Sequence, residues 1–271
     1  MFKPPVIVRR ADPSLIAAEK TPQAARGSAG SALGAILAAT QAEQGTAAFT
    51  ARPAAWRRSH YSRIFTPNSA ALSNETFRAG VATISDNVMD AVRSVMTCAP
   101  DYLVMGMSAI TFFGGQKGAD AFVRKMQEAT GIGISIGSHS TTAALRAYGG
   151  VERIAILSPY WPVMNEAVTG YFADMGFTVV RDIALQCRSW TAIAQVTPAQ
   201  CVDALRKLDG DDVDALVQVG TNLSMVGLAA AAEIWLGKPV IAINAATYWH
   251  ALRANGIADR MQGFGRLLSD F

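Results

Sequence analysis

The sequence has little cysteine and little histidine, with three residues of each in a chain of 271. These residues are Cys98, Cys187, Cys201, His60, His139 and His250. They lie far apart, without a CxxC pair or a histidine spacing that binds zinc, so the sequence predicts no metal site. An odd number of separated cysteines favours free thiols in a reducing compartment, which predicts a cytoplasmic protein.

Charged residues are also scarce, at 17% of the chain against 51% hydrophobic residues. No uncharged apolar run reaches the roughly 18 residues that a membrane helix needs. The nearest, Leu223–Gly237, is rich in alanine and contains Glu233, which predicts a buried helix. We therefore expect a compact soluble protein with buried parallel strands and no membrane partner.

Basic residues are not gathered on the body of the chain. The formal net charge of +3 comes from residues 1–30, and the remainder is neutral in sum. Nucleic-acid binding needs basic residues clustered on a folded face, so none is predicted. Residues 1–30 contain several prolines and no apolar core of a secretory signal. They predict a disordered extension, with a weak targeting leader as the alternative.

Common catalytic and cofactor motifs are missing as well. The chain has no GxSxG elbow, no GxxxxGK[ST] loop and no HExxH pair. No GxGxxG fingerprint follows the first predicted strand. The sequence therefore predicts neither a bound nucleotide nor any other cofactor.

Apolar runs that end in small or polar residues alternate with helical patterns almost throughout. The predicted strands are Leu33–Ala38, His60–Phe65, Tyr102–Met107, Ile132–Ile136, Arg153–Leu157, Thr178–Ala184, Ala215–Val219 and Val240–Ile243. One long helix is predicted over Asn74–Met96, with Ser73 or Asn74 as its cap. This alternation predicts an α/β fold with parallel sheets that are covered by helices on both faces.

The order of the segments repeats along the chain. Ala144–Gly149 reappears as Ala251–Gly256, and the apolar strands that precede the two copies end at Ile136 and Ile243, the same 107 residues apart. We expect two similar Rossmann-like lobes with parallel four-stranded sheets, related by a pseudo-two-fold axis with a ligand cleft between them. The first lobe is assigned to residues 31–138 plus 250–271, and the second to residues 139–249.

Two hydroxyl-bearing loops follow corresponding strands of the two lobes. Ser108 lies just after Gly106 and Met107, and Thr221 follows Gly220. Hydroxyls and backbone N–H groups at such strand ends can bind an anion, although hydroxyls there are often only helix caps. Tyr160 also ends a strand, where a tyrosine is about as often part of the core as a ligand contact.

These strand ends resemble the arylmalonate decarboxylase and maleate isomerase branch of the aspartate/glutamate racemase superfamily. Met105–Ser108 is similar to the family's oxyanion-binding loop, Ser158–Tyr160 to its segment with a substrate-binding tyrosine, and Val217–Asn222 to its cysteine-bearing loop. The resemblance runs from about His60 to the C-terminus.

The resemblance implies a set of site residues. The substrate-binding candidates are Gln41, Met107, Ser108, Tyr160, Trp190, Gly220, Thr221 and Asn222, with Phe112, Phe113, Trp161 and Val219 as further apolar walls. The two positions that carry the family's catalytic cysteines are Gly106 and Val219, and neither residue can transfer a proton. Cys187, directly after a strand, is the remaining catalytic candidate, with a small buried hydrophobic residue as the alternative.

The resemblance implies an enzyme that acts on a small carboxylic acid through an enediolate-like intermediate, nearest to arylmalonate decarboxylase. A maleate cis-trans isomerase or racemase-like enzyme is one alternative. A carboxylate-binding protein without turnover is another, because both cysteine positions are changed. The expected ligand is a small carboxylate or dicarboxylate, and a homo-oligomer is possible.

Overall fold

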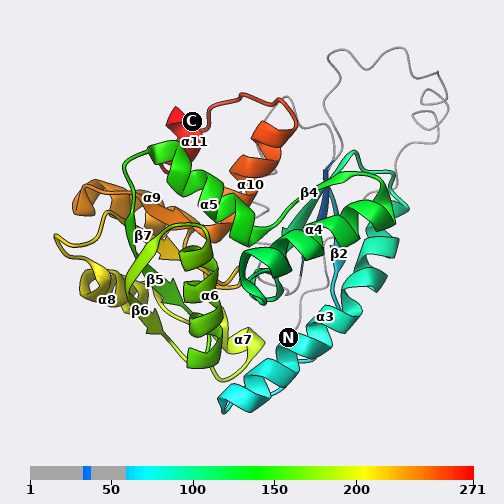
Figure 1. Ribbon diagram of the computed structural model, residues 1–271, viewed down its shortest axis with the longest axis horizontal. Helices are drawn as coiled ribbons and strands as arrows, with labels where there is room; N and C mark the ends of the chain where they lie inside the picture. Colours follow the sequence, from blue (N-terminus) through cyan, green and yellow to red (C-terminus); the bar gives the residue numbers. More distant parts are fainter. Residues whose placement is uncertain (1–32, 38–58) are drawn as a thin grey trace, which may run out of the picture. The chain divides into compact units, whose positions relative to one another are not determined.

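The computed structural model describes residues 33–37 and 59–271 (Figure 1). The predicted extension over residues 1–30 and the candidate Gln41 lie outside the described residues. The chain separates into residues 1–30 and a single compact unit, Ser31–Phe271, and the fold below is that of the second unit.

Among residues 33–37 and 59–271, eight strands form two parallel sheets with the same internal order. The first sheet has the order β2-β1-β3-β4 and the second has the order β6-β5-β7-β8. The strands are β1 (Leu33–Leu37), β2 (Ser59–Arg63), β3 (Tyr102–Gly106), β4 (Gly133–Ser135), β5 (Arg153–Ser158), β6 (Thr178–Ala184), β7 (Ala215–Gln218) and β8 (Val240–Ala242). The predicted fold class is confirmed, because each strand of the first sheet has a counterpart at the same place in the second.

Helices follow the strands, as the alternation predicts. They are α3 (Asn74–Met96), α4 (Gly115–Thr130), α5 (Gly137–Tyr148), α6 (Pro162–Asp174), α7 (Trp190–Ile193), α8 (Pro198–Leu208), α9 (Val226–Leu236), α10 (Ile243–Ala254) and α11 (Arg266–Asp270), with a short 3-10 turn, η2, at Ala109–Thr111. Helix α3 packs against β1 and β2, whereas α6 and α8 pack against strands of the second sheet. Within the described residues, no helix is long and apolar enough to cross a membrane.

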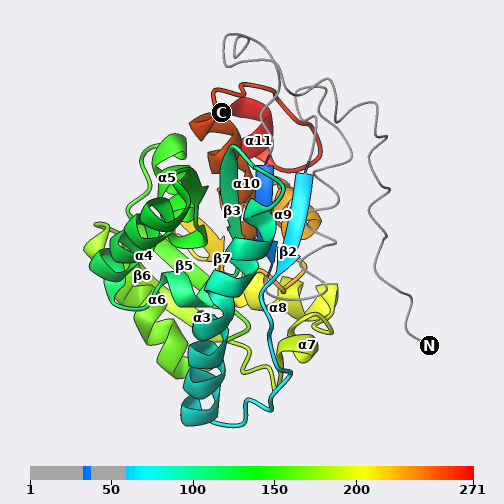
Figure 2. The same ribbon diagram turned by 90° about the vertical axis from the view of Figure 1, so that its right-hand side faces the viewer.

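The two repeats meet at helices α5 and α10, which pack side by side (Figures 1 and 2). Helix α10 also packs against β3 and β4 of the first sheet, and His250 on it hydrogen-bonds Ser135 at 2.7 Å. The chain therefore returns to the first sheet after completing the second. The residue boundaries of the two predicted lobes stay a prediction.

Helix α3 begins where its sequence favours a helix start. Ser73 accepts a hydrogen bond from the Thr76 N–H, and the Thr76 hydroxyl accepts one from the Ser73 N–H, forming a capping box. Apolar residues at helical spacing, including Phe77, Val81 and Ile84, are buried on one face. The sequence prediction of this helix is confirmed at both ends.

Helix α9 differs from the prediction of a buried helix over Leu223–Gly237. Its single charged residue, Glu233, is buried, whereas Ile234 is 85% exposed and Trp235 is 44% exposed. Glu233 accepts hydrogen bonds from the Tyr148 hydroxyl and from the Arg266 N–H. The inward carboxylate has partners from α5 and α11, so the helix turns an apolar face outward instead of burying it.

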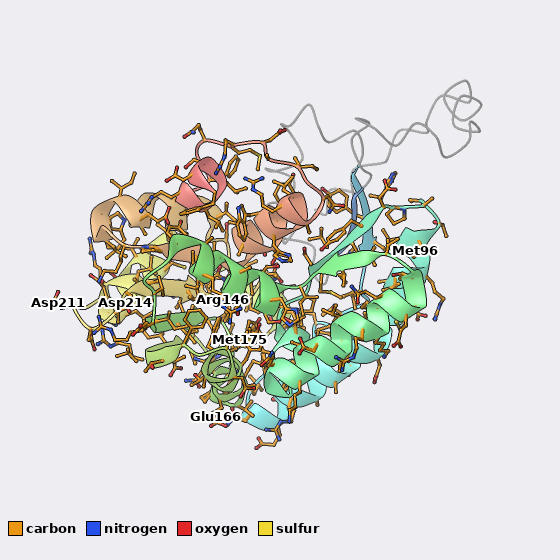
Figure 3. All side chains as sticks on the ribbon, turned by 45° about the horizontal axis from the view of Figure 1, so that its top comes forward. Met96, Arg146, Glu166, Met175, Asp211 and Asp214 are labelled. Carbon is orange, nitrogen blue, oxygen red and sulfur yellow. The ribbon has the colours of Figure 1, made fainter. Side chains whose placement is uncertain are left out.

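Labelled side chains in Figure 3 show contacts away from the carboxyl ends of the strands. On this view Arg146, near the end of α5, lies beside Met175, which follows α6, and its guanidinium donates to the Met175 carbonyl at 3.2 Å. Asp211 and Asp214 lie on the loop before β7, at the amino-terminal end of the second sheet. The residues predicted to bind ligand follow the opposite, carboxyl-terminal ends of the strands.

Candidate functional site

Three residues predicted to bind ligand meet where β3, β5 and β7 end. The Ser108 Oγ lies 2.8 Å from the Tyr160 hydroxyl and accepts a hydrogen bond from the Thr221 N–H at 3.3 Å. Ser108 is fully buried, and Tyr160 and Thr221 are almost so. We call these residues the Ser108–Tyr160–Thr221 cluster. Because the carboxyl ends of parallel strands carry the ligands of α/β proteins, the cluster lies where a ligand is expected.

Neither hydroxyl in the two symmetric loops caps a helix. Ser108 precedes the 3-10 turn η2 but makes no side-chain capping bond. Thr221 lies four residues before Met225, which is the first flanking residue of α9. The alternative of simple helix caps therefore does not account for these two residues.

Tyr160 is held by its own backbone and by its surroundings. Its N–H donates to the Ser158 hydroxyl at 3.1 Å, and that hydroxyl in turn hydrogen-bonds Asn165. Its ring lies 5.6 Å from that of Phe77. Burial raises the pKa of the Tyr160 phenol well above its ordinary value, and the hydrogen bond to Ser108 opposes this only in part. The phenol is therefore a neutral hydrogen-bond donor at physiological pH.

The loop after β7 depends on a glycine. Gly220 has a φ of +94°, and a Cβ there would lie 2.5 Å from the Pro159 ring atoms Cγ and Cδ. The Gln218 side-chain amide donates to the carbonyls of Val219 and Gly220 at 2.7 and 2.8 Å. These two bonds turn the carbonyl oxygens toward Gln218, so that the next N–H, that of Thr221, points at Ser108.

A pocket opens beside the cluster. It is lined by Thr66, Ile84, Met107, Tyr160, Trp190, Ile193, Gly220, Thr221 and Asn222. None of these side chains is charged, so an anion bound here would be held by neutral hydroxyl, amide and backbone N–H donors. Six lining residues are sequence candidates, whereas Thr66, Ile84 and Ile193 were missed. The place of Ile84 on the apolar face of α3 predicted its burial but not its role as a pocket wall.

Trp190 forms a wall of the pocket at the start of α7. Its ring lies 5.3 Å from that of Phe77 on α3. A Cβ at position 80 would lie 3.2 Å from the indole, so Gly80 gives the ring room against the helix. Next to it, Thr191 and Asn68 exchange two hydrogen bonds of 2.9 and 3.1 Å, which join α7 to the segment that follows β2.

The other apolar candidates lie elsewhere. Phe112 is fully buried against Tyr171 and Phe172, and it does not line the pocket. The Trp161 indole N–H donates to the Cys187 carbonyl at 3.2 Å. Phe113 is partly buried against the core.

The structure does not place a thiol in the pocket. Gly106 ends β3, and Val219 is fully buried, with its N–H donating to the Leu157 carbonyl at 2.9 Å. Cys187 is half-buried and is not among the lining residues. Burial raises the pKa of the Cys187 thiol to about 11, so the thiol is protonated at neutral pH. Among the described residues, no group of histidine, cysteine or acidic side chains is arranged to hold a metal ion.

Sequence comparison finds relatives over most of the chain. The chain is 26% identical to the arylmalonate decarboxylase of Bordetella bronchiseptica over 194 residues, which are 70% of this chain and 80% of that protein. It is 32% identical to the maleate isomerase of Pseudomonas putida over 120 residues, which are 44% of this chain and 48% of that isomerase.

Solved structures of the same kind share the fold. A Cys-to-Ser mutant of the Nocardia farcinica maleate cis-trans isomerase, with a covalently bound succinylcysteine intermediate, superposes with a TM-score of 0.79 at 24% identity, covering 89% of this chain and 99% of that one. A crystal structure of arylmalonate decarboxylase superposes with a TM-score of 0.69 at 22% identity, covering 88% and 98% of the two chains.

A family model settles the relationship. The model described as arylmalonate decarboxylase matches residues 62–268, which include both hydroxyl-bearing loops and Tyr160. The resemblance indicated by the strand-end residues is thereby confirmed. The chain belongs to the arylmalonate decarboxylase family.

Proposed function

We propose that the chain is an enzyme that binds a small malonate-type acid beside the Ser108–Tyr160–Thr221 cluster and decarboxylates it through an enediolate. The observation that carries this proposal is the convergence of a phenol, a hydroxyl and a backbone N–H, from the ends of three strands, next to one uncharged pocket. Membership of a family whose named relatives are decarboxylases and isomerases supports it.

The retained carboxylate is the group that the cluster would hold. When the bond between the α-carbon and the leaving carboxylate breaks, its electron pair passes to the α-carbon and into the retained carboxylate, and CO2 departs. The resulting enediolate carries more negative charge on its oxygens than the substrate carboxylate did. Fixed donors such as the Tyr160 hydroxyl and the Thr221 N–H stabilise this charge as it develops.

The leaving carboxylate would face the apolar wall. Ile84, Trp190 and Ile193 line the pocket and offer no hydrogen-bond donor from their side chains beyond the indole N–H. A carboxylate beside apolar groups is poorly solvated, whereas neutral CO2 is not disfavoured there. The wall therefore favours the loss of CO2 over retention of the charged group.

The final step needs a proton for the α-carbon. The two family cysteine positions, Gly106 and Val219, have no thiol to supply this proton, and Cys187 does not line the pocket. The Tyr160 phenol lines the pocket and carries a proton at neutral pH. We assign this proton to the Tyr160 phenol, which becomes a phenolate as the α-carbon is protonated and regains a proton from solvent after the product leaves.

A carboxylate-binding protein without turnover is the second candidate. The observation in its favour is the replacement of both family cysteine positions by Gly106 and Val219, which leaves the donors of the cluster in place. Isomerisation of maleate by addition of a thiol is less well supported, because the pocket offers no thiol among its lining residues.

Proton NMR in D2O distinguishes these functions. The protein is mixed separately with phenylmalonate, methylmalonate and maleate, and the Tyr160→Phe variant serves as the matched control. The proposal predicts loss of CO2 with deuterium incorporated at the α-carbon, and a rate at least tenfold lower in the variant. Ligand line broadening without any product would replace the proposal by the binding-protein alternative.

A further inference from the structure

The amide of Asn222 has a fixed orientation at the edge of the pocket. Asn222 follows β7 and lines the pocket together with Trp190 and Thr221. Its Nδ2 donates to the Trp190 main-chain carbonyl at 2.6 Å. A carbonyl oxygen can only accept a hydrogen bond, so a flipped amide would set two acceptors against each other. The Oδ1 oxygen is therefore the atom turned away from Trp190.

That oxygen has no hydrogen-bond donor. The Asn222 Oδ1 is shielded from solvent, and no donor of the described residues reaches it. A buried acceptor without a donor is destabilising, and such atoms are rare in folded proteins. The comparable amide on the same side of the fold, Asn244, donates to the Thr221 carbonyl at 2.9 Å and has no such orphaned atom. Unlike Asn244, Asn222 therefore has a buried acceptor to which no donor is bound.

We infer that the natural ligand carries an O–H or N–H donor next to its carboxylate, and that Asn222 Oδ1 accepts a hydrogen bond from it. This inference rests on the proposed function, because it names the substrate class of the same pocket. The ligand would be a malonate-type acid substituted at the α-carbon by a hydroxyl or amino group. A carboxylate cannot take this place, because its oxygens are acceptors as well and would repel Oδ1.

The two sides of the pocket would then orient the ligand together. The Tyr160 hydroxyl and the Thr221 N–H, which hydrogen-bond Ser108 in this structure, would share their donors with the ligand, and Asn222 offers an acceptor. A carboxylate turns toward the donors, and the α-substituent turns toward the acceptor. Binding requires the pocket to widen beside Trp190, because Oδ1 is covered in this structure.

Matched ligands test the inference. Dissociation constants are measured by calorimetry for hydroxymalonate, aminomalonate and methylmalonate, whose substituents are similar in size but differ in donors. For the wild-type protein we expect hydroxymalonate or aminomalonate to bind about fivefold more tightly than methylmalonate, the value of one neutral hydrogen bond. In Asn222→Leu the three acids should bind with about equal affinity. Asn222→Ser, measured in parallel, covers the case in which the leucine variant does not fold.

Asn244→Leu is the control variant, because Asn244, at the start of α10, donates a similar hydrogen bond to the Thr221 carbonyl of this loop and does not contact the Asn222 Oδ1. It should change the affinity for all three acids equally and keep the preference. Equal or weaker binding of both donor-bearing acids by the wild type would overturn the inference while leaving the proposed function intact. Absence of binding by every acid would overturn both.

Discussion

At the residue scale, Gly220 has the strictest conformational requirement in the site. Its positive φ and the 2.5 Å approach of the Pro159 ring leave no room for a side chain. Because the following N–H is the one that points at Ser108, the backbone at Gly220 sets a donor of the cluster. The glycine is thus a requirement of the site as well as of the loop.

The substitution Gly220→Ala tests this requirement. We expect it to lower the free energy of unfolding by about 1–3 kcal/mol, because alanine is strained at this φ and its Cβ meets Pro159. Urea denaturation gives this value, and calorimetry with phenylmalonate should show weaker binding. Gly170→Ala is the control, since Gly170 lies within α6 with open space around it and should gain about 0.5–1 kcal/mol. Equal urea midpoints for the two variants would contradict the conformational requirement at Gly220.

The sequence could indicate the polar members of the site but not all of its walls. Ser108, Tyr160 and Thr221 were found because they directly follow strands, and the carboxyl ends of strands share one edge of a parallel sheet. Ile84 and Ile193 are apolar residues on helices, and nothing local separates a pocket wall from the core. Their place depends on how α3 and α7 pack, which only tertiary contacts determine.

At the element scale, α3 is the helix that links the first sheet to the pocket. Its buried face brings Phe77 against both Tyr160 and Trp190, and Ile84 to the pocket wall. Its start is fixed by the capping box of Ser73 and Thr76. The Asn74 side chain also accepts a hydrogen bond from the Val163 N–H at 3.1 Å, which joins the start of α3 to the start of α6.

Removal of the cap should destabilise the whole unit. We expect Ser73→Ala to lower the free energy of unfolding by about 1 kcal/mol, because the Thr76 N–H loses its acceptor. Urea denaturation followed by circular dichroism measures the change. Ser69→Ala, at an exposed position outside the helix, should change stability by less than about 0.5 kcal/mol. A cap variant as stable as this control would show that α3 starts independently of Ser73.

The elements themselves were largely predictable. All eight strands lie within two residues of their predicted bounds, because short apolar runs between polar residues have few alternatives in an α/β chain. The repeat indicated two similar sheets. The outward apolar face of α9 could not be predicted, since its sequence alone does not reveal that Tyr148 and the Arg266 N–H hold Glu233 inward.

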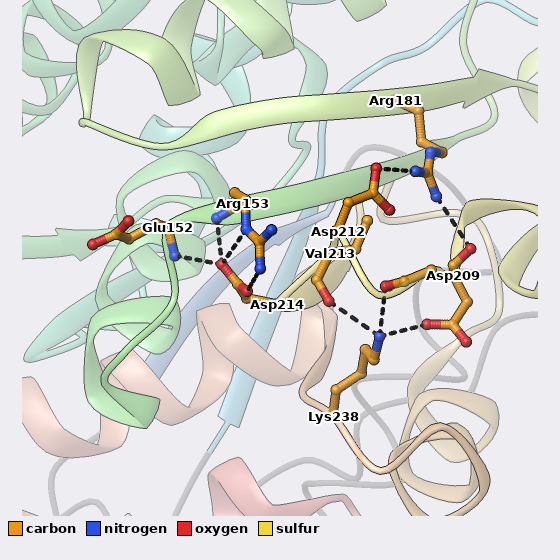
Figure 4. Close-up of polar contacts among 9 residues, drawn as sticks. Glu152, Arg153, Arg181, Asp209, Asp212, Val213, Asp214 and Lys238 are labelled. Carbon is orange, nitrogen blue, oxygen red and sulfur yellow. Dashed lines mark hydrogen bonds and ion pairs between the residues drawn. The ribbon is translucent and has the colours of Figure 1, made fainter.

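At the scale of the whole molecule, the second sheet has different chemistry at its two ends. Neutral donors gather at the carboxyl ends of the strands, whereas ion pairs gather at the amino-terminal end (Figure 4). Arg153 pairs with Asp214 at 2.7 Å, and Lys238 pairs with Asp209 at 2.7 Å. Asp214 also accepts from the N–H groups of Glu152 and Arg153 at 3.1 and 2.7 Å. We infer that the ion pairs stabilise the fold and that the end with neutral donors binds the ligand.

This assignment predicts a pH dependence of stability. Hydrogen bonds from the Arg153 side chain lower the pKa of Asp214 to about 2, below its ordinary value of 3.8. The Asp214 carboxylate therefore binds a proton more tightly in the unfolded chain than in the folded one. The stabilisation that its charge gives to the fold is complete above pH 4 and is lost as the pH falls toward 2. Asp214→Asn should be less stable than the wild type at pH 7, and the difference should shrink over that window.

Urea midpoints between pH 2 and 7 measure this effect. Asp211→Asn is the matched control, because Asp211 lies on the same loop at the edge of the molecule (Figure 3) and is exposed. No ion pair of Asp211 is found within the described structure. Its midpoint should follow the wild type throughout. A difference between Asp214→Asn and the wild type that stays constant down to pH 2 would show that the carboxylate charge is not the cause.

The central claim is that a carboxylate binds beside the Ser108–Tyr160–Thr221 cluster, and a crystal structure with phenylmalonate tests it most directly. We predict one carboxylate oxygen within hydrogen-bond distance of the Tyr160 hydroxyl and the Thr221 N–H, with the second carboxylate against the apolar wall of Ile84, Trp190 and Ile193. An unoccupied pocket in crystals soaked at saturating phenylmalonate, or a ligand bound elsewhere with Ser108 and Tyr160 still paired to each other, would contradict the account.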